Sequence, residues 1–562
     1  MRMNLLKILL ITIFLSYQST AYPKTNDLKD FNQKYLSNYF SALLSYDNQN
    51  NKKALKYFNS SKYLLNKHEK FLKKYVFSLI IDGQVSKAIK QIKYSKNKNN
   101  SDFFEAKILL IIDSIIKKDF KKASKLLKDN DNFYRKDTYE FIIYETLKNY
   151  NKVFLNKKIE DKLEDFDKLS LITSAFQNCY LNTNKTKSNF INLINLDDGN
   201  YSRYLFFYFG NIIENKEYES AKQISATIDE LSSSLLILQA KKWIEELEFK
   251  KFNKFFSCKN EVDILGEFFF LVSNLYSSQN DYEKSNFYLN ISNYLNPNFY
   301  FNMSQLSENY FNNNNFDMAK KVLENFDKKD EIYYWYKIKK ISQIIGNQQN
   351  KNEALKFIES KFKNFKKPGI RMLYDRGNIF KNYQKYEESI EFYSLVLSQI
   401  DENSQAYADI LYRRGGSYER IGKHEKSDAD LLKSLEINPE DPYVMNYLAY
   451  SWLERNYNIE EAIQMLERAH KQEKNDPYIM DSIGWGYYLI GEYAIAEKYL
   501  KQVVQIMPDD PIVNDHYGDI LWKLNRKLQA KYFWESVLNM SNAEEKMKKK
   551  ILKKLLKGPD KI

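Results

Sequence analysis

The sequence predicts an all-α solenoid built from antiparallel helix pairs. An Asp-Pro dipeptide recurs at Asp441-Pro442, Asp476-Pro477 and Asp510-Pro511, in steps of 35 and 34 residues, and each copy marks the entry to one helix pair. The 562 residues include only 15 glycines and 9 prolines, too few for the frequent turns of an all-β protein. Stacked repeats also suit this length, because each repeat buries its apolar face against its neighbours only.

The repeat that begins at Pro477 is the clearest copy. Its first helix carries Met480, Ile483, Gly484 and Tyr487, and its second carries Ala496, Leu500 and Val503, followed by Pro508. This pattern resembles the tetratricopeptide repeat, in which a small residue lies where the two helices cross and large apolar residues surround it. Similar copies begin near Leu373, Ala408, Pro442 and Pro511, so residues 370–540 are predicted to form five repeats. The resemblance implies a right-handed superhelical solenoid.

Weaker copies of the same pattern occur upstream. Fragments centre on Ala54, Ala88, Ala123 and Ala221, and fuller copies carry Phe269 with Tyr276 and Met303 with Tyr310. Residues 22–369 are therefore predicted to form a degenerate solenoid of the same kind. Between about 134 and 200 no repeat register is evident, and only apolar periodicity predicts helices there.

The N-terminus predicts export. Arg2 and Lys7 flank the start of an apolar run over residues 8–15, and Ser19-Thr20-Ala21 supplies small residues before a cleavage point. Residues 1–21 are therefore predicted to be a cleavable signal peptide, with a retained anchor as the alternative. The expected location is the periplasm of a Gram-negative bacterium, in association with the cell envelope.

No residue pattern predicts catalysis, a metal or a cofactor. The two cysteines, Cys179 and Cys258, are 79 residues apart without metal-ligand spacing, and either a disulfide or two free thiols is compatible with the sequence. The four histidines are scattered, and Gly484, Gly486 and Gly491 follow no strand that would make them a nucleotide-binding loop. The chain is predicted not to be an enzyme, with no catalytic residues, no metal and no cofactor.

Charge is distributed unevenly along the chain. The total is +13, but residues 401–540 carry a net −8 and residues 541–562 a net +5. Lys546 to Lys557 form an amphipathic helix with Met547, Ile551, Leu552, Leu555 and Leu556 on its apolar face. Residues 541–562 are predicted to be a basic capping helix, and peripheral membrane contact is the alternative. Nucleic acid is not an expected partner, because export separates the chain from most nucleic acid.

The resemblance also implies a binding groove. In tetratricopeptide repeats, four positions on the first helix of each pair line the concave face. In three successive repeats of this sequence they are Tyr443, Asn446, Tyr450 and Leu453, then Tyr478, Asp481, Trp485 and Tyr488, then Ile512, Asp515, Asp519 and Trp522. We refer to these twelve as the groove residues. All except Leu453 and Ile512 are predicted to bind the partner.

The groove is aromatic and acidic, and this composition narrows the partner. Aromatic side chains give large contact area at little entropic cost. Asp481 and Asp515 occupy a position where related repeats that hold a C-terminal carboxylate have a lysine, so such a ligand would meet like charge. A basic or neutral extended protein segment fits better.

The sequence thus predicts a non-enzymatic scaffold that binds a protein partner in its C-terminal groove. The alternative is a non-catalytic superhelical subunit of a cell-wall or glycan-processing assembly, with sugars bound in the aromatic groove.

Overall fold

The computed structural model describes residues 33–95, 98–128, 135–136, 138–159, 164–196 and 202–559. The predicted signal peptide lies outside these ranges. Within them the chain forms helices and no β-strand, as the sequence predicts. The helices group into two compact units: unit 1 comprises residues 1–228 and 233–361, and unit 2 comprises residues 229–232 and 362–562.

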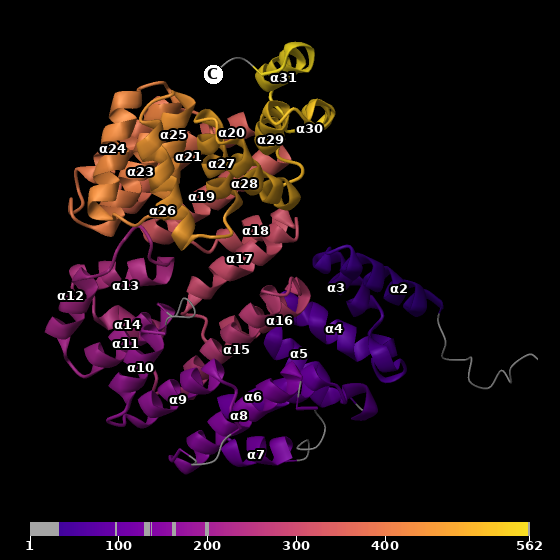
Figure 1. The fold of residues 1–562 in the computed structure, drawn as a ribbon. Helices are drawn as coiled ribbons and strands as arrows, with labels where there is room; N and C mark the ends of the chain where they lie inside the picture. Colours follow the sequence, from indigo (N-terminus) through magenta and orange to yellow (C-terminus); the bar gives the residue numbers. More distant parts are fainter. Residues whose placement is uncertain are drawn as a thin grey trace, which may run out of the picture. The chain divides into compact units, whose positions relative to one another are not determined.

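Unit 2 contains five helix pairs that begin where the five sequence repeats begin (Figure 1). Consecutive helices of each pair pack against one another, and each pair packs against the next. The pairs are α21 (Ile370–Asn382) with α22 (Tyr386–Leu397), α23 (Gln405–Arg420) with α24 (His424–Ile437), α25 (Pro442–Glu454) with α26 (Ile459–Gln472), α27 (Pro477–Leu489) with α28 (Tyr493–Ile506), and α29 (Pro511–Lys523) with α30 (Lys527–Asn539). A last helix, α31 (Glu545–Lys557), follows them.

The Asp-Pro dipeptides start three of these helices by capping them. Asp441 Oδ1 accepts hydrogen bonds from the backbone N–H of Tyr443 at 3.0 Å and of Val444 at 3.1 Å. Asp476 and Asp510 cap α27 and α29 in the same way. The proline that follows lacks the N–H that the first turn cannot satisfy, so the dipeptide specifies a helix start.

Small residues bring the two helices of a pair together. A Cβ added to Gly484 would lie 1.8 Å from Leu500 Cδ2, and one added to Gly518 would lie 2.4 Å from Trp534 Nε1. Ala496, opposite Gly484 on the second helix, is fully buried. These contacts explain why the repeat pattern has a small residue at the crossing.

Unit 1 consists of shorter and less regular helix pairs. Its helices are α2 (Gln33–Asp47), α3 (Asn51–Ser60), α4 (Glu69–Ile81), α5 (Val85–Tyr94), α6 (Phe104–Ile116), α7 (Phe120–Lys128), α8 (Tyr139–Asn156), α9 (Lys168–Leu181), α10 (Thr186–Ile194), α11 (Arg203–Glu214), α12 (Tyr218–Ala226), α13 (Leu235–Glu245), α14 (Lys250–Phe255), α15 (Glu261–Ser277), α16 (Tyr282–Leu295), α17 (Met303–Asn312), α18 (Phe316–Leu323), α19 (Glu331–Gln348) and α20 (Lys351–Phe362). The four alanines around which the weak repeats centre, Ala54, Ala88, Ala123 and Ala221, are all fully buried, as residues at helix crossings should be.

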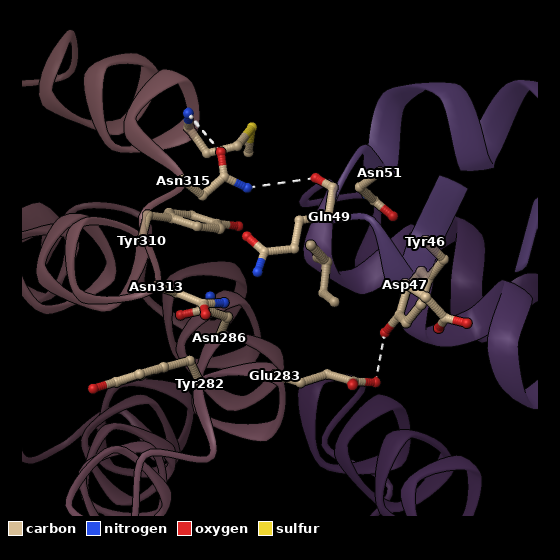
Figure 2. A pocket seen from close by; sticks show the side chains of 12 residues that line it. Tyr46, Asp47, Gln49, Asn51, Tyr282, Glu283, Asn286, Tyr310, Asn313 and Asn315 are labelled. Carbon is tan, nitrogen blue, oxygen red and sulfur yellow. Dashed lines mark hydrogen bonds between the residues drawn. The ribbon is translucent and has the colours of Figure 1, made fainter. Parts of the chain in front are cut away.

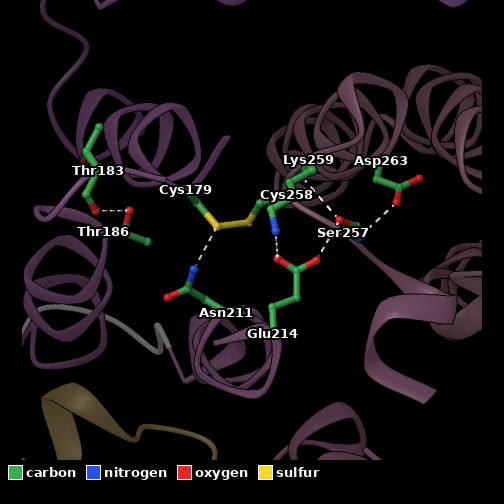
Figure 3. Close-up of a disulfide and its surroundings, with 9 residues drawn as sticks. All are labelled: Cys179, Thr183, Thr186, Asn211, Glu214, Ser257, Cys258, Lys259 and Asp263. Atoms are coloured by element: carbon green, nitrogen blue, oxygen red, sulfur yellow. Dashed lines mark hydrogen bonds and ion pairs between the residues drawn. A yellow bond between two sulfur atoms is a disulfide. The ribbon is translucent and has the colours of Figure 1, made fainter. Parts of the chain in front are cut away.

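A disulfide joins Cys179 on α9 to Cys258 in the segment before α15 (Figure 3). Their Cα atoms are 5.7 Å apart, within the usual range for a bridge. Both cysteines are buried, and the side-chain amide of Asn211 donates a hydrogen bond to Cys179 Sγ at 3.8 Å. The bridge settles the question of pairing that the spacing of the cysteines leaves open.

Membrane insertion has no support from the helices of the two units. None of the helices in the described ranges is both long and apolar enough to cross a membrane.

Candidate functional site

Helix α31 packs on the last repeat of unit 2 and covers part of its groove residues. Ile551 is fully buried, and Met547 and Leu555 pack against the apolar cluster that includes Trp534. The sequence placed Leu552 and Leu556 on the same packed face, and this is wrong: they are 52% and 84% exposed. Their place on the packed side is taken by Lys554, which is buried.

Lys554 is buried because two groove carboxylates receive it. Its ammonium contacts Asp515, and it lies 2.6 Å from Asp519 Oδ2. A second lysine of α31, Lys550, lies 3.4 Å from Asp515 Oδ2. Two of the three predicted acidic groove residues therefore bind the chain's own C-terminal helix, and both are covered.

Asp519 is the less well satisfied of these two carboxylates. Burial, with a contribution from the neighbouring Asp515, raises the pKa of Asp519 to about 6, although Lys554 opposes the shift. Its Oδ1 atom is buried and has no hydrogen-bond partner in the part of the chain that the structure describes. One lysine thus serves two buried carboxylates and compensates Asp519 only in part.

The third acidic groove residue, Asp481, pairs with His516. His516 Nδ1 lies 3.0 Å from Asp481 Oδ2, and both side chains are buried. Burial alone would lower the pKa of His516, but the charge of Asp481 and its hydrogen bond, together with Asp515 and Glu454, raise it above the ordinary value. The sequence analysis did not assign His516 to the groove.

An aromatic stack continues from this pair. The ring of His516 stacks on Trp485 with centroids 4.2 Å apart, and Trp485 stacks on Tyr488 at 4.9 Å. Tyr450 lies beside His516, with ring centroids 6.5 Å apart. Tyr488 is 1% exposed, so it supports Trp485 from below and does not itself face a partner.

The groove residues of α25 and α27 that remain accessible form a smaller surface. Tyr443 and Tyr478, at equivalent positions of successive repeats, are 52% and 60% exposed. Asn446, Tyr450 and Trp485 are half-buried. We call these five residues the open groove. Ile512 is exposed on α29, whereas Trp522 is half-buried beside Trp534, with centroids 5.4 Å apart.

Two polar atoms in the open groove lack partners. Asn446 Oδ1 and Trp485 Nε1 are buried, and neither has a hydrogen-bond partner among the described residues. One is an acceptor and the other a donor. Such atoms can receive the N–H and the C=O of an extended main chain.

Metal or acid–base chemistry has no assembled site in the described ranges. No group of three or more His, Cys, Asp or Glu side chains there is placed to hold a metal ion.

Comparison with known proteins identifies the repeat. Residues 408–441, which span α23 and α24, match the family model described as tetratricopeptide repeat. The chain carries tetratricopeptide repeats. A TPR repeat-containing protein of Pseudomonas aeruginosa is 32% identical over 123 residues, covering 21% of this chain and 21% of that protein. The match thus spans about a fifth of the length of that relative.

Solved structures with similar helix arrangements are also tetratricopeptide-repeat proteins. One from Parabacteroides merdae is 18% identical and covers 46% of this chain and 98% of its own, with a TM-score of 0.38. Another, from Thermus thermophilus, is 16% identical and covers 34% of this chain and 100% of its own, with a TM-score of 0.29. The tetratricopeptide repeats themselves support a protein–protein interaction scaffold.

Proposed function

We propose that unit 2 binds an extended protein segment in the open groove, and that the chain is a non-enzymatic scaffold. One observation carries this proposal: two unpartnered polar atoms, Asn446 Oδ1 and Trp485 Nε1, lie among accessible aromatic side chains. Buried polar groups are almost always hydrogen-bonded, so a main chain that supplied both partners would bind favourably. Tyr443 and Tyr478 would provide apolar contact on either side.

The charge around the open groove favours a neutral or basic segment. Glu454, Asp481, Asp515 and Asp510 all act on the Tyr450 hydroxyl and, after burial, help to raise its pKa. The buried position of Lys554 is an internal example of a basic side chain held by groove carboxylates. The predicted preference for a basic or neutral partner is retained, but Asp515 and Asp519 are assigned to α31.

We also propose that the chain is exported to the periplasm and works at the cell envelope. The N-terminal pattern of Arg2, Lys7 and the apolar run supports export. The Cys179–Cys258 bridge supports an oxidising compartment, because disulfides persist there and are rare in the cytosol. Leu552 and Leu556, exposed beside lysines of α31, would allow peripheral contact with an anionic membrane.

Affinity capture from a membrane-plus-periplasm extract tests the binding proposal. The variant carries Tyr443→Ala, Tyr478→Ala and Trp485→Phe, which remove exposed aromatic area and the indole N–H while leaving the buried charge pairs intact. The control carries Tyr457→Ala and Tyr532→Ala, which remove equally exposed tyrosines outside the groove. Proteins that are lost with the groove variant and retained with the control support the proposal. Identical capture by both variants would remove it.

A further inference from the structure

Unit 1 contains a cavity of about 270 Å³ where several helix ends meet (Figure 2). The turn between α2 and α3 forms one wall through Asp47 and Gln49, and the start of α16 forms another through Glu283 and Asn286. The end of α17 contributes Tyr310. The cavity is separate from the groove residues, which all lie in unit 2.

The Tyr310 side chain points to a ligand in this cavity. Tyr310 is 5% exposed, and its hydroxyl is buried without a hydrogen-bond partner in the described part of the chain. Figure 2 shows the hydroxyl directed toward Gln49 at the opposite wall. A buried hydroxyl without a partner is unfavourable, so a ligand atom that bonds to it would gain affinity.

The other polar groups of the cavity are held in fixed orientations. Asn286 is 5% exposed, and its Oδ1 accepts a hydrogen bond of 2.8 Å from Asn309 Nδ2. The Tyr46 hydroxyl donates to Glu283 Oε1 at 2.7 Å. The Asn315 amide reaches across to the backbone oxygen of Gln49 at 3.4 Å. A lining fixed before binding loses little entropy when a ligand enters.

The chemistry of the lining selects the ligand. Side-chain amides and carboxylates surround the cavity together with three tyrosines, and none of the described residues that line it is basic. An anionic ligand would therefore meet like charge from Asp47 and Glu283. Planar amides donate and accept at once, which suits the adjacent hydroxyl groups of a sugar, and tyrosine rings suit its apolar faces.

We propose that this cavity binds one ring of a neutral sugar, at the end of a glycan or as a free saccharide. Its volume is just below the range of cavities that hold drug-sized ligands, as expected for a single ring. A peptide is the less favoured occupant, because the lining comes from helix ends and not from the row of first helices along which repeats hold extended segments.

Calorimetric titration of the full chain tests the proposal. The probes are the methyl glycosides of glucose and N-acetylglucosamine and their β-1,4-linked disaccharides. Glucuronic acid serves as the anionic probe and acetyl-trialanine amide as the peptide probe. We expect heat from at least one neutral sugar and none from the last two probes. Loss of one hydrogen bond in Tyr310→Phe should weaken that binding about fivefold.

The matched control is Tyr276→Phe, which removes a buried hydroxyl of the same unit outside the cavity and should leave sugar affinity unchanged. Asn313→Ala changes an exposed lining residue without disturbing the core and should also weaken binding. Absence of heat from every neutral sugar would overturn the proposal, as would equal affinity in wild type, Tyr310→Phe and Asn313→Ala. Binding of the peptide probe alone would replace it with a peptide site.

Discussion

The ammonium of Lys554 contacts the carboxylate of Asp515, and both side chains are buried, at 5% and 3% exposure. Asp519 completes the group from the next turn of α29. A basic helix and an acidic first helix thus neutralise one another within unit 2. The net negative charge of residues 401–540 is consequently less available to a partner than the sequence suggests.

Replacement of Lys554 by methionine is expected to destabilise unit 2 by about 3–5 kcal/mol, because it leaves two buried carboxylates without a cation. Urea denaturation followed by tryptophan fluorescence measures the change. Lys553→Met, on the exposed side of the same helix, should change stability by less than about 0.5 kcal/mol. Equal effects of the two substitutions would show that α31 does not depend on the buried lysine.

The His516–Asp481 pair predicts a pH-dependent contribution to stability. The folded pKa of His516 is raised above its unfolded value of about 6.5, so the contribution is complete below that value and is lost as pH rises through the folded pKa. The stability difference between wild type and His516→Gln should be larger at about pH 6 than at about pH 9. A difference that stays constant across this range would contradict protonation of the buried ring.

The helix pairs of unit 2 were predictable because their determinants are local. Asp476 caps α27 from the residue before Pro477, and Gly484 is needed for one contact with Leu500 in the same pair. A residue spacing therefore carries the information. Unit 1 lacks these dipeptides, and only buried alanines such as Ala54 preserve the pattern.

The site was less predictable because exposure depends on a distant helix. Transfer of positions from the repeat pattern placed Asp515 and Asp519 on the groove face, but the docking of α31 decides that they are covered. The charges of adjacent segments, net −8 and net +5, were a usable signal for this docking. His516 was missed because its partner, Asp481, lies one repeat away.

The glycine at the crossing of α27 and α28 predicts a strong effect of a single methyl group. Gly484→Ala would place Cβ 1.8 Å from Leu500 Cδ2, so we expect destabilisation of about 1–3 kcal/mol. In the double variant with Leu500→Ala, the two losses should not add, because the shorter side chain removes the clash. Additive losses would show that the backbone, and not Leu500, limits the space.

Gly210→Ala is the matched control for this crossing. Nothing lies within 4 Å of a Cβ added there, and the residue is inside α11, so the change should be neutral or stabilise by about 0.5–1 kcal/mol. A large loss at Gly210 would mean that any methyl group in these helices disturbs packing.

The Cys179–Cys258 bridge closes a chain segment with a sequence separation of 79 residues, and its loss is expected to destabilise unit 1. A loop of this length predicts a cost of about 3–4 kcal/mol, since reduction restores conformational entropy to the unfolded chain. Urea denaturation with and without reductant measures it, and Cys179→Ala/Cys258→Ala, which should not respond to reductant, is the control. Alkylation of both thiols in unreduced protein would contradict the bridge, and it would also remove the support that the bridge gives to export.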